Sequence, residues 1–263
     1  MKAMPHNPPV QNFEITFDLL PELIRDKEGQ QEHVPTEDLP AFLVEFAELW
    51  FVRAQLAYLF GEPAEGIVRY LWRGLEEAKK ASVFGHETNP WRMWDYLSSS
   101  LAAGDYPSAH FFSSLSENRV WNPAHKPVPW LVLQVQVLAA IFQSGEHPGR
   151  VARLQELYEA VFRVQLPEEL NDQLPEIRNT YATLDALAAG NAKEFNSHLS
   201  MRMDILSRYF SKQNTSATAA LIDLHGLGLC RLARRRGMEV AVRHVYLPLE
   251  LLQAFTPSAA PRI

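Results

Sequence analysis

The sequence has one cysteine and no long apolar run. Because Cys230 has no second cysteine to pair with, a disulfide within the chain is excluded. The longest apolar stretch, residues 128–142, is interrupted by Pro129, Gln134 and Gln136 and is shorter than the roughly 20 residues that cross a bilayer. The first twenty residues lack the basic-then-apolar order of a secretory signal. We therefore expect no membrane partner and a cytoplasmic location.

The sequence also lacks the short motifs that mark common catalytic and cofactor sites. It contains no GxGxxG, GxxxxGKS/T, HExxH, GxSxG or CxxC pattern. None of its nine histidines stands three or four residues from another, so no helical face offers a ready pair of metal ligands. The sequence therefore predicts no metal, no cofactor and no enzymatic activity.

The composition is that of a folded globular protein, with 47% hydrophobic and 21% charged residues among 263. The net charge of −6 is distributed unevenly. Residues 1–50 hold ten acidic and three basic residues, whereas residues 201–263 hold four acidic and nine basic ones. An acidic N-terminal face attracts a basic partner and repels nucleic acid, although charge runs are also typical of plain solvated surfaces. We expect no binding of DNA or RNA.

Apolar residues recur at three- and four-residue steps along most of the chain, which predicts an all-α fold. Proline, glycine and the acids near helix starts set the expected boundaries. The predicted helices cover residues 36–60, 63–82, 90–101, 106–116, 130–144, 149–165, 174–189, 192–210 and 215–236. Residues 238–246 alternate and predict a short strand or extended arm, and residues 248–252 predict one final turn.

These elements suggest four segments within what is expected to be one compact unit. They are an irregular docking arm over residues 1–35, an N-terminal helical half over 36–120, a Pro-rich connector over 121–130 and a C-terminal helical half over 131–263. The arm is expected to dock through its apolar residues, Phe13, Ile15, Phe17, Leu19, Leu20, Leu23 and Ile24.

Two helix–helix corners share the pattern Ala-Ala-Gly followed by Asp or Asn, at residues 102–105 and 188–191. In each, the glycine is expected to take the left-handed position after the first helix, and Asp105 or Asn191 is expected to cap the second. Such corners are typical of tetratricopeptide-like hairpins, although the strict spacing and most signature residues of those repeats are missing. The pattern favours a degenerate array of stacked antiparallel hairpins.

The polar residues most strongly predicted to be buried lie near residue 225. Asp223 and His225 are two positions apart, about 200° around a helix, so they cannot act as one acid–base pair. We expect Asp223 to bond an arginine or a helix end, and Gly226 and Gly228 to allow close helix packing. Cys230 is expected to be a small buried side chain rather than a nucleophile.

Several segments resemble members of the immunity protein 49 family. The main one runs from Leu-Ile-Asp-Leu-His-Gly-Leu-Gly-Leu-Cys at residue 221 to Tyr-Leu-Pro-Leu-Glu-Leu-Leu at residue 252, and residues 187–196 and 101–105 add weaker similarity. The similarity extends over about residues 40–252. It implies an all-α bacterial immunity protein of a polymorphic or secreted toxin system, which binds a cognate toxin and has no catalytic residues.

The resemblance identifies no toxin-contacting positions, so candidate residues are chosen on physical grounds. Acids could neutralise a basic toxin surface and speed association, while aromatic side chains could form a desolvated centre. The spacing of Trp91 and Trp94 equally fits a buried ridge, and Trp50 and Trp72 are predicted to lie in the core. The candidates are Glu37, Asp38, Glu45, Glu48, Trp91, Trp94 and Tyr96.

The expected partner is therefore a basic toxin domain, and a homo-oligomer is compatible with the sequence. The alternative is a helical-repeat adaptor or regulator with a different protein partner. An enzyme with an unfamiliar site is a third interpretation, which a strongly shifted carboxylate or histidine in a deep pocket would favour.

Overall fold

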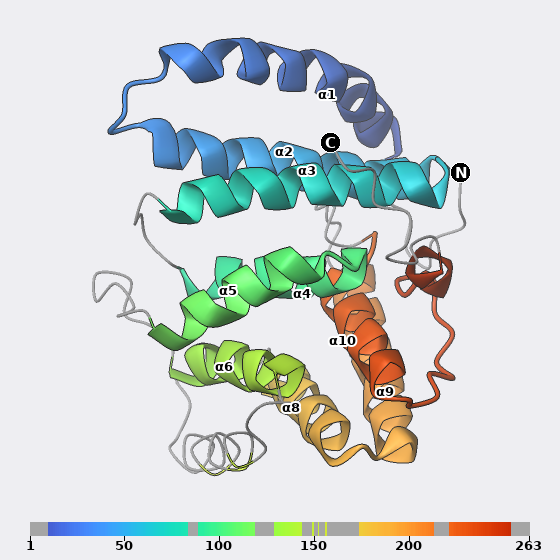
Figure 1. Cartoon of the computed structure of the whole chain (residues 1–263). Helices are drawn as coiled ribbons and strands as arrows, with labels where there is room; N and C mark the ends of the chain where they lie inside the picture. Colours follow the sequence, from blue (N-terminus) through green and yellow to red (C-terminus); the bar gives the residue numbers. More distant parts are fainter. Residues whose placement is uncertain are drawn as a thin grey trace.

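The computed structural model describes residues 10–83, 89–118, 129–143, 174–212 and 221–253, together with residues 149, 152 and 156 (Figure 1). These residues form α-helices and short 3-10 turns but no β-strand, so the predicted all-α class is confirmed. The helices are α1 (Val10–Gln30), α2 (Leu39–Leu59), α3 (Ala64–Val83), α4 (Pro90–Ala103), α5 (Tyr106–Asn118), α6 (Pro129–Gln143), α8 (Leu174–Ala189), α9 (Ala192–Lys212) and α10 (Leu224–Arg235). The 3-10 turn η1 (Gln31–His33) follows α1, and the 3-10 turn η5 (Leu249–Leu252) follows α10 near the end of the described residues.

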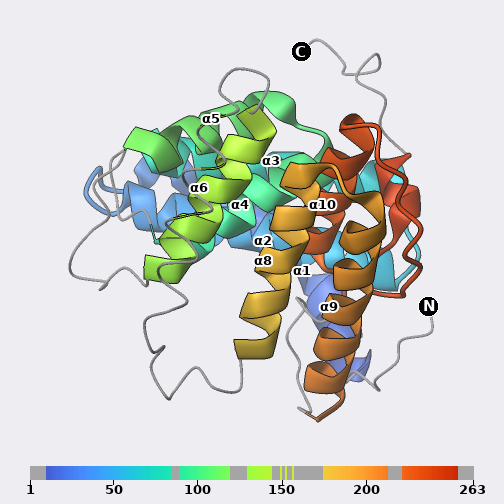
Figure 2. The same cartoon turned by 90° about the horizontal axis from the view of Figure 1, so that it is seen from below.

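Neighbouring helices pair as hairpins around one apolar core. The hairpin of α2 and α3 lies between α1 on its outer side and α4 on its inner side, and α6 packs beyond α4 and α5 (Figure 1). The hairpin of α8 and α9 runs across the direction of these helices (Figure 2), and α10 packs along α4. The turn η5 contacts α3, α4 and α10, so residues 249–252 pack against the same core as the earlier helices. The tetratricopeptide-like repetition stays a prediction.

Both predicted corner devices are confirmed. Gly104 and Gly190 have positive φ values of 71° and 70°, which place them in the left-handed region. The side chain of Asp105 accepts a hydrogen bond from the Ser108 amide at 3.1 Å, and that of Asn191 accepts one from the Glu194 amide at 3.2 Å. Each corner thus ends one helix and caps the next with two consecutive residues.

The contact between α10 and α4 depends on a glycine, as predicted. A Cβ atom built on Gly228 would lie 2.6 Å from the carbonyl oxygen of Ser98, much closer than atoms can approach. The two helix backbones therefore meet directly at this point. Cys230 lies two residues further along α10 and is buried, and burial raises the pKa of its thiol.

Asp223 pairs with a buried arginine, one of the two kinds of partner that the sequence predicted. Its carboxylate accepts two hydrogen bonds from Arg202 on α9, at 3.0 and 3.2 Å, and Arg202 also donates to Glu176 and Thr180 on α8. Burial alone raises the pKa of Asp223, but the Arg202 guanidinium lowers it more, so the net pKa lies below its ordinary value. The pair joins α8, α9 and the start of α10.

The prediction of an irregular arm over residues 1–35 is wrong for most of its length. Residues 10–30 form helix α1, although Pro21 lies inside it. Proline has no N–H for the carbonyl four residues earlier, which is that of Phe17. That carbonyl instead accepts a hydrogen bond of 3.0 Å from Arg53 on α2. A tertiary contact therefore replaces the bond that the proline removes.

Only part of the expected apolar contact of this segment is present. Phe13, Leu20 and Ile24 are buried and Phe17 is partly buried against the core, whereas the other three apolar residues, Ile15, Leu19 and Leu23, are exposed.

Two further boundaries differ from the predictions. Helix α10 begins at Leu224, and residues 221–223 before it are not helical. Residues 238–243 form neither helix nor strand, with Met238, Val240 and Val242 buried, and His244 and Leu247 form an isolated antiparallel bridge around a turn. Residues 121–128 of the predicted connector lie outside the described residues. Its last two residues, 129 and 130, are the first two of α6. The helix predicted over 149–165 is described only at residues 149, 152 and 156, which are helical.

Candidate partner-binding surface

The four candidate acids lie on α2 or in the turn before it. Glu37 and Asp38 are exposed in the turn before α2, where Asp38 occupies the N-cap position without a capping bond from its side chain. Glu45 and Glu48 are exposed on α2 itself. The structure thus places all four acids along one helix and its approach.

Two of these acids already have partners within the chain. Glu45 forms an ion pair of 2.8 Å with Lys27 on α1, and Glu48 forms one of 3.2 Å with Arg92 on α4. Such exposed pairs contribute about 0–1 kcal/mol to stability. Glu37 and Asp38 form no ion pair with any described residue. They are therefore the two candidate acids that have no ion-pair partner among the described residues.

The three candidate aromatic residues do not form one surface. Trp91 is 44% exposed and makes a T-shaped contact with Trp130, with ring centroids 5.4 Å apart. Trp94 is only 2% exposed and lies against His225 of α10, and Tyr96 is buried between Phe51 and Phe112. Trp91 is thus the aromatic candidate that a partner can reach, whereas Trp94 and Tyr96 hold α4 in the core.

The two tryptophans predicted to be core residues are half-buried. Trp50 stacks on Tyr70, with ring centroids 6.0 Å apart, and Trp72 donates a hydrogen bond of 3.3 Å to the carbonyl of Ala103.

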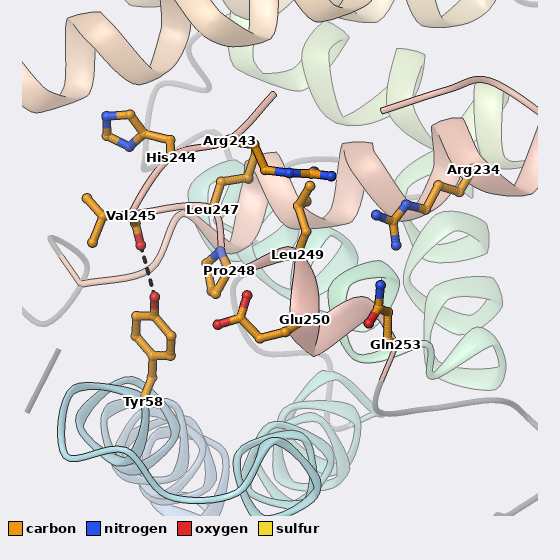
Figure 3. A pocket seen from close by; sticks show the side chains of 10 residues that line it. All are labelled: Tyr58, Arg234, Arg243, His244, Val245, Leu247, Pro248, Leu249, Glu250 and Gln253. Atoms are coloured by element: carbon orange, nitrogen blue, oxygen red, sulfur yellow. Dashed lines mark hydrogen bonds between the residues drawn. The ribbon is translucent and has the colours of Figure 1, made fainter. Parts of the chain in front are cut away.

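A pocket of about 480 Å³ lies between the end of α2 and the segment that follows α10 (Figure 3). The Tyr58 hydroxyl donates a hydrogen bond of 3.1 Å to the carbonyl of Val245 at its edge. Burial and the nearby charge of Glu250 raise the pKa of Tyr58 to about 12, and burial lowers the pKa of His244. The lining residues are Tyr58, Arg234, Arg243, His244, Val245, Leu247, Pro248, Leu249, Glu250 and Gln253.

These groups can donate hydrogen bonds and carry charge. Tyr58 is protonated at neutral pH and its proton is directed at a backbone oxygen. The carboxylate with the lowered pKa, Asp223, is buried in its pair with Arg202 and does not line this pocket. Within the described ranges no group of three or more His, Cys, Asp or Glu side chains is placed to hold a metal ion.

None of the described helices is long and apolar enough to cross a membrane.

The fold is a helical scaffold that presents four exposed acids on α2 and in the turn before it. Its sequence falls within a recognised family. The family model for Immunity protein 49 matches residues 53–251, so the chain belongs to the immunity protein 49 family. No curated protein and no solved structure matches this chain.

The candidate residues divide unevenly between the matched and unmatched parts. The three aromatic candidates lie inside the matched residues, whereas all four acids and helix α1 precede them. The described surface also includes the exposed apolar side of α1, whose residues were expected from the sequence to dock on the rest of the protein. Its signal was the four-residue spacing of Ile15, Leu19 and Leu23.

Proposed function

We propose that this protein is an immunity protein that binds a cognate bacterial toxin in the cytoplasm and neutralises it by direct contact, without catalysis. Membership of the immunity protein 49 family carries this proposal. A binding role requires no catalytic group of its own, and the proposal therefore assigns none.

The toxin that this surface suits has a basic face. Four acids are exposed on α2 or in the turn before it, namely Glu37, Asp38, Glu45 and Glu48. Their field would steer a basic toxin towards α2 and raise the association rate more than the final affinity. Because salt screens such attraction, the gain in rate is largest at low ionic strength.

The primary experiment is co-expression of the tagged protein with the C-terminal toxin domain encoded by the adjacent upstream gene. A stable complex, together with rescue of growth, is the expected result. A toxin domain from an unrelated system serves as the control and should be neither bound nor neutralised. If no complex forms and growth is not rescued, the proposal is contradicted and an adaptor with a different partner is favoured.

The contribution of charge is tested best at the acids without internal partners. The double variant Glu37→Lys/Asp38→Lys should slow toxin association about tenfold at low salt, and the difference should shrink as salt is added. Glu239→Lys, an exposed reversal in the segment packed on α9, is the matched control. Equal association rates for the two variants would show that this face does not contribute to the interface.

A further inference from the structure

Helix α1 has two separate apolar faces. Phe13, Leu20 and Ile24 are buried against the body of the protein. Ile15, Leu19 and Leu23 follow one another at four-residue steps and are 54%, 49% and 46% exposed. With about 100° of rotation per residue, this second stripe lies roughly 120° around the helix from the buried one. We call these three residues the outer stripe.

The outer stripe is a concentration of apolar surface rather than scattered exposure. Seven large hydrophobic side chains are exposed among the described residues, and three of them form this stripe. The helix lies on the outside of the α2–α3 hairpin, with no other described helix beyond it (Figure 1). Contiguous apolar side chains on a soluble protein mark an interaction site.

The structure holds α1 in place, so the stripe is presented by an ordered helix. Arg53 donates to the Phe17 carbonyl at 3.0 Å, and its guanidinium lies 3.8 Å from the centre of the Phe17 ring. Further along α1, Lys27 pairs with Glu45 at 2.8 Å and lies 4.3 Å from the centre of the Phe42 ring. A helix fixed at two points loses little conformational freedom when a partner binds it.

Acidic side chains border the outer stripe on one side. Asp18, Glu22 and Asp26 are exposed and form no ion pair with any described residue. Helix α1 as a whole carries five acidic and two basic residues, a net charge of −3. A second copy docked on this stripe would place −3 against −3, and an anionic lipid surface would be repelled in the same way.

We infer that the outer stripe of α1 is the apolar centre of the toxin interface, and that it inserts into an apolar groove bordered by basic side chains on the toxin. This inference rests on the proposed function and names the contact that it requires. Helix-in-groove recognition uses apolar anchors at this spacing. The stripe supplies the desolvated centre, and Asp18, Glu22 and Asp26 supply the charge that complements the basic border.

The affinity test uses the full chain and the toxin domain encoded directly upstream. The double variant Leu19→Gln/Leu23→Gln should weaken binding about 100-fold, mainly through faster dissociation. The matched control is Met201→Gln, which alters a side chain of similar exposure (50%) on α9 and should change affinity less than about twofold. Helical content by circular dichroism should be the same in all three proteins, because the substituted side chains are about half exposed.

A second experiment labels an introduced cysteine, which is practical because the only cysteine of the chain, Cys230, is buried. An environment-sensitive fluorophore on Leu19→Cys should shift to shorter wavelength when the toxin domain is added, whereas the same label on Met201→Cys should not. The wild-type chain, with Cys230 alone, should take up little label and provides the blank.

The outcomes separate the two proposals. If the wild type binds the toxin and the Leu19→Gln/Leu23→Gln variant binds equally well, the inference is overturned while the immunity function stands. If the wild type does not bind, the function fails and the inference fails with it. If sedimentation of the protein alone shows a dimer that the same variant dissociates, a second copy covers the stripe and the inference is overturned.

Discussion

Arg53 compensates for a proline, and this gives the sharpest prediction for the fold. Because Pro21 has no N–H, the Phe17 carbonyl depends on the Arg53 guanidinium, which also pairs with Glu62 at 2.9 Å. We expect Arg53→Met to detach the middle of α1 from α2. The variant keeps an apolar stem of similar length but removes both donors and the charge.

The magnitude follows from the separate contacts. A hydrogen bond from a charged donor contributes about 1.5–3 kcal/mol, and a guanidinium over an aromatic ring adds about 0.5–2 kcal/mol. Since these contributions overlap, Arg53→Met should lower the free energy of unfolding by about 2–4 kcal/mol. Arg73→Met removes an exposed ion pair with Glu76 and should cost less than about 1 kcal/mol. Urea unfolding of both variants measures the difference.

A double-mutant cycle then tests the cause. Pro21→Ala restores an N–H that can reach the Phe17 carbonyl, and Pro21 is exposed, so the substitution disturbs no core contact. In the Arg53→Met background it should recover about 1 kcal/mol more than it adds to the wild type. If the two effects simply add, Arg53 does not replace the lost helical bond and the reasoning is refuted.

Two other contacts give predictions of the same kind. Gly228→Ala would place a Cβ atom 2.6 Å from the Ser98 carbonyl and should destabilise the protein by about 1–3 kcal/mol in urea unfolding, whereas Gly29→Ala on α1 meets nothing within 4 Å and should not destabilise it. Arg202→Met leaves Asp223 charged and buried, and should cost about 3–5 kcal/mol. Because the pKa of Asp223 is lowered by folding, its contribution is complete above the unfolded value near 4 and is lost as the pH falls through the folded value. The stability difference between wild type and Asp223→Asn should therefore shrink below about pH 4, and a difference independent of pH would contradict this account.

Local signals explain which parts of the fold the sequence predicted well. The starts of α4 at Pro90, α5 at Tyr106 and α9 at Ala192 follow directly from proline and from the Gly-Asp and Gly-Asn corners. These signals act within four residues, so they need no knowledge of the rest of the chain.

The errors arose where a distant residue decides the local structure. Nothing near Pro21 shows that Arg53 will supply the missing donor. Residues 238–246 have the alternation of a strand, but Asn196 on α9 bonds the backbone on both sides of Val240, accepting from the Ala241 amide at 2.7 Å and donating to the Glu239 carbonyl at 2.8 Å. The side-chain amide of Asn196 therefore makes backbone hydrogen bonds of the kind that a neighbouring strand would make.

The candidate site shows the same division. Exposure of Glu37 and Asp38 follows from their polarity, whereas burial of Trp94 depends on α10, which lies about 130 residues further along the chain. The outer stripe could be found from its spacing only once α1 is known to be a helix. Its exposure, in contrast to the burial of Phe13, is settled by how α1 packs on α2.

The hydrogen bond between Tyr58 and Val245 joins residues 187 positions apart, and this separation limits how soon a newly synthesised molecule can complete its fold. At about 5–20 residues per second, a ribosome needs about 10–40 s to travel that distance. During this interval α2 and α4 have emerged, but the faces that α10 and η5 cover are still bare. A nascent chain that stops short of η5 therefore lacks part of its core, and packing of that core is complete only after residues 249–252 have been synthesised.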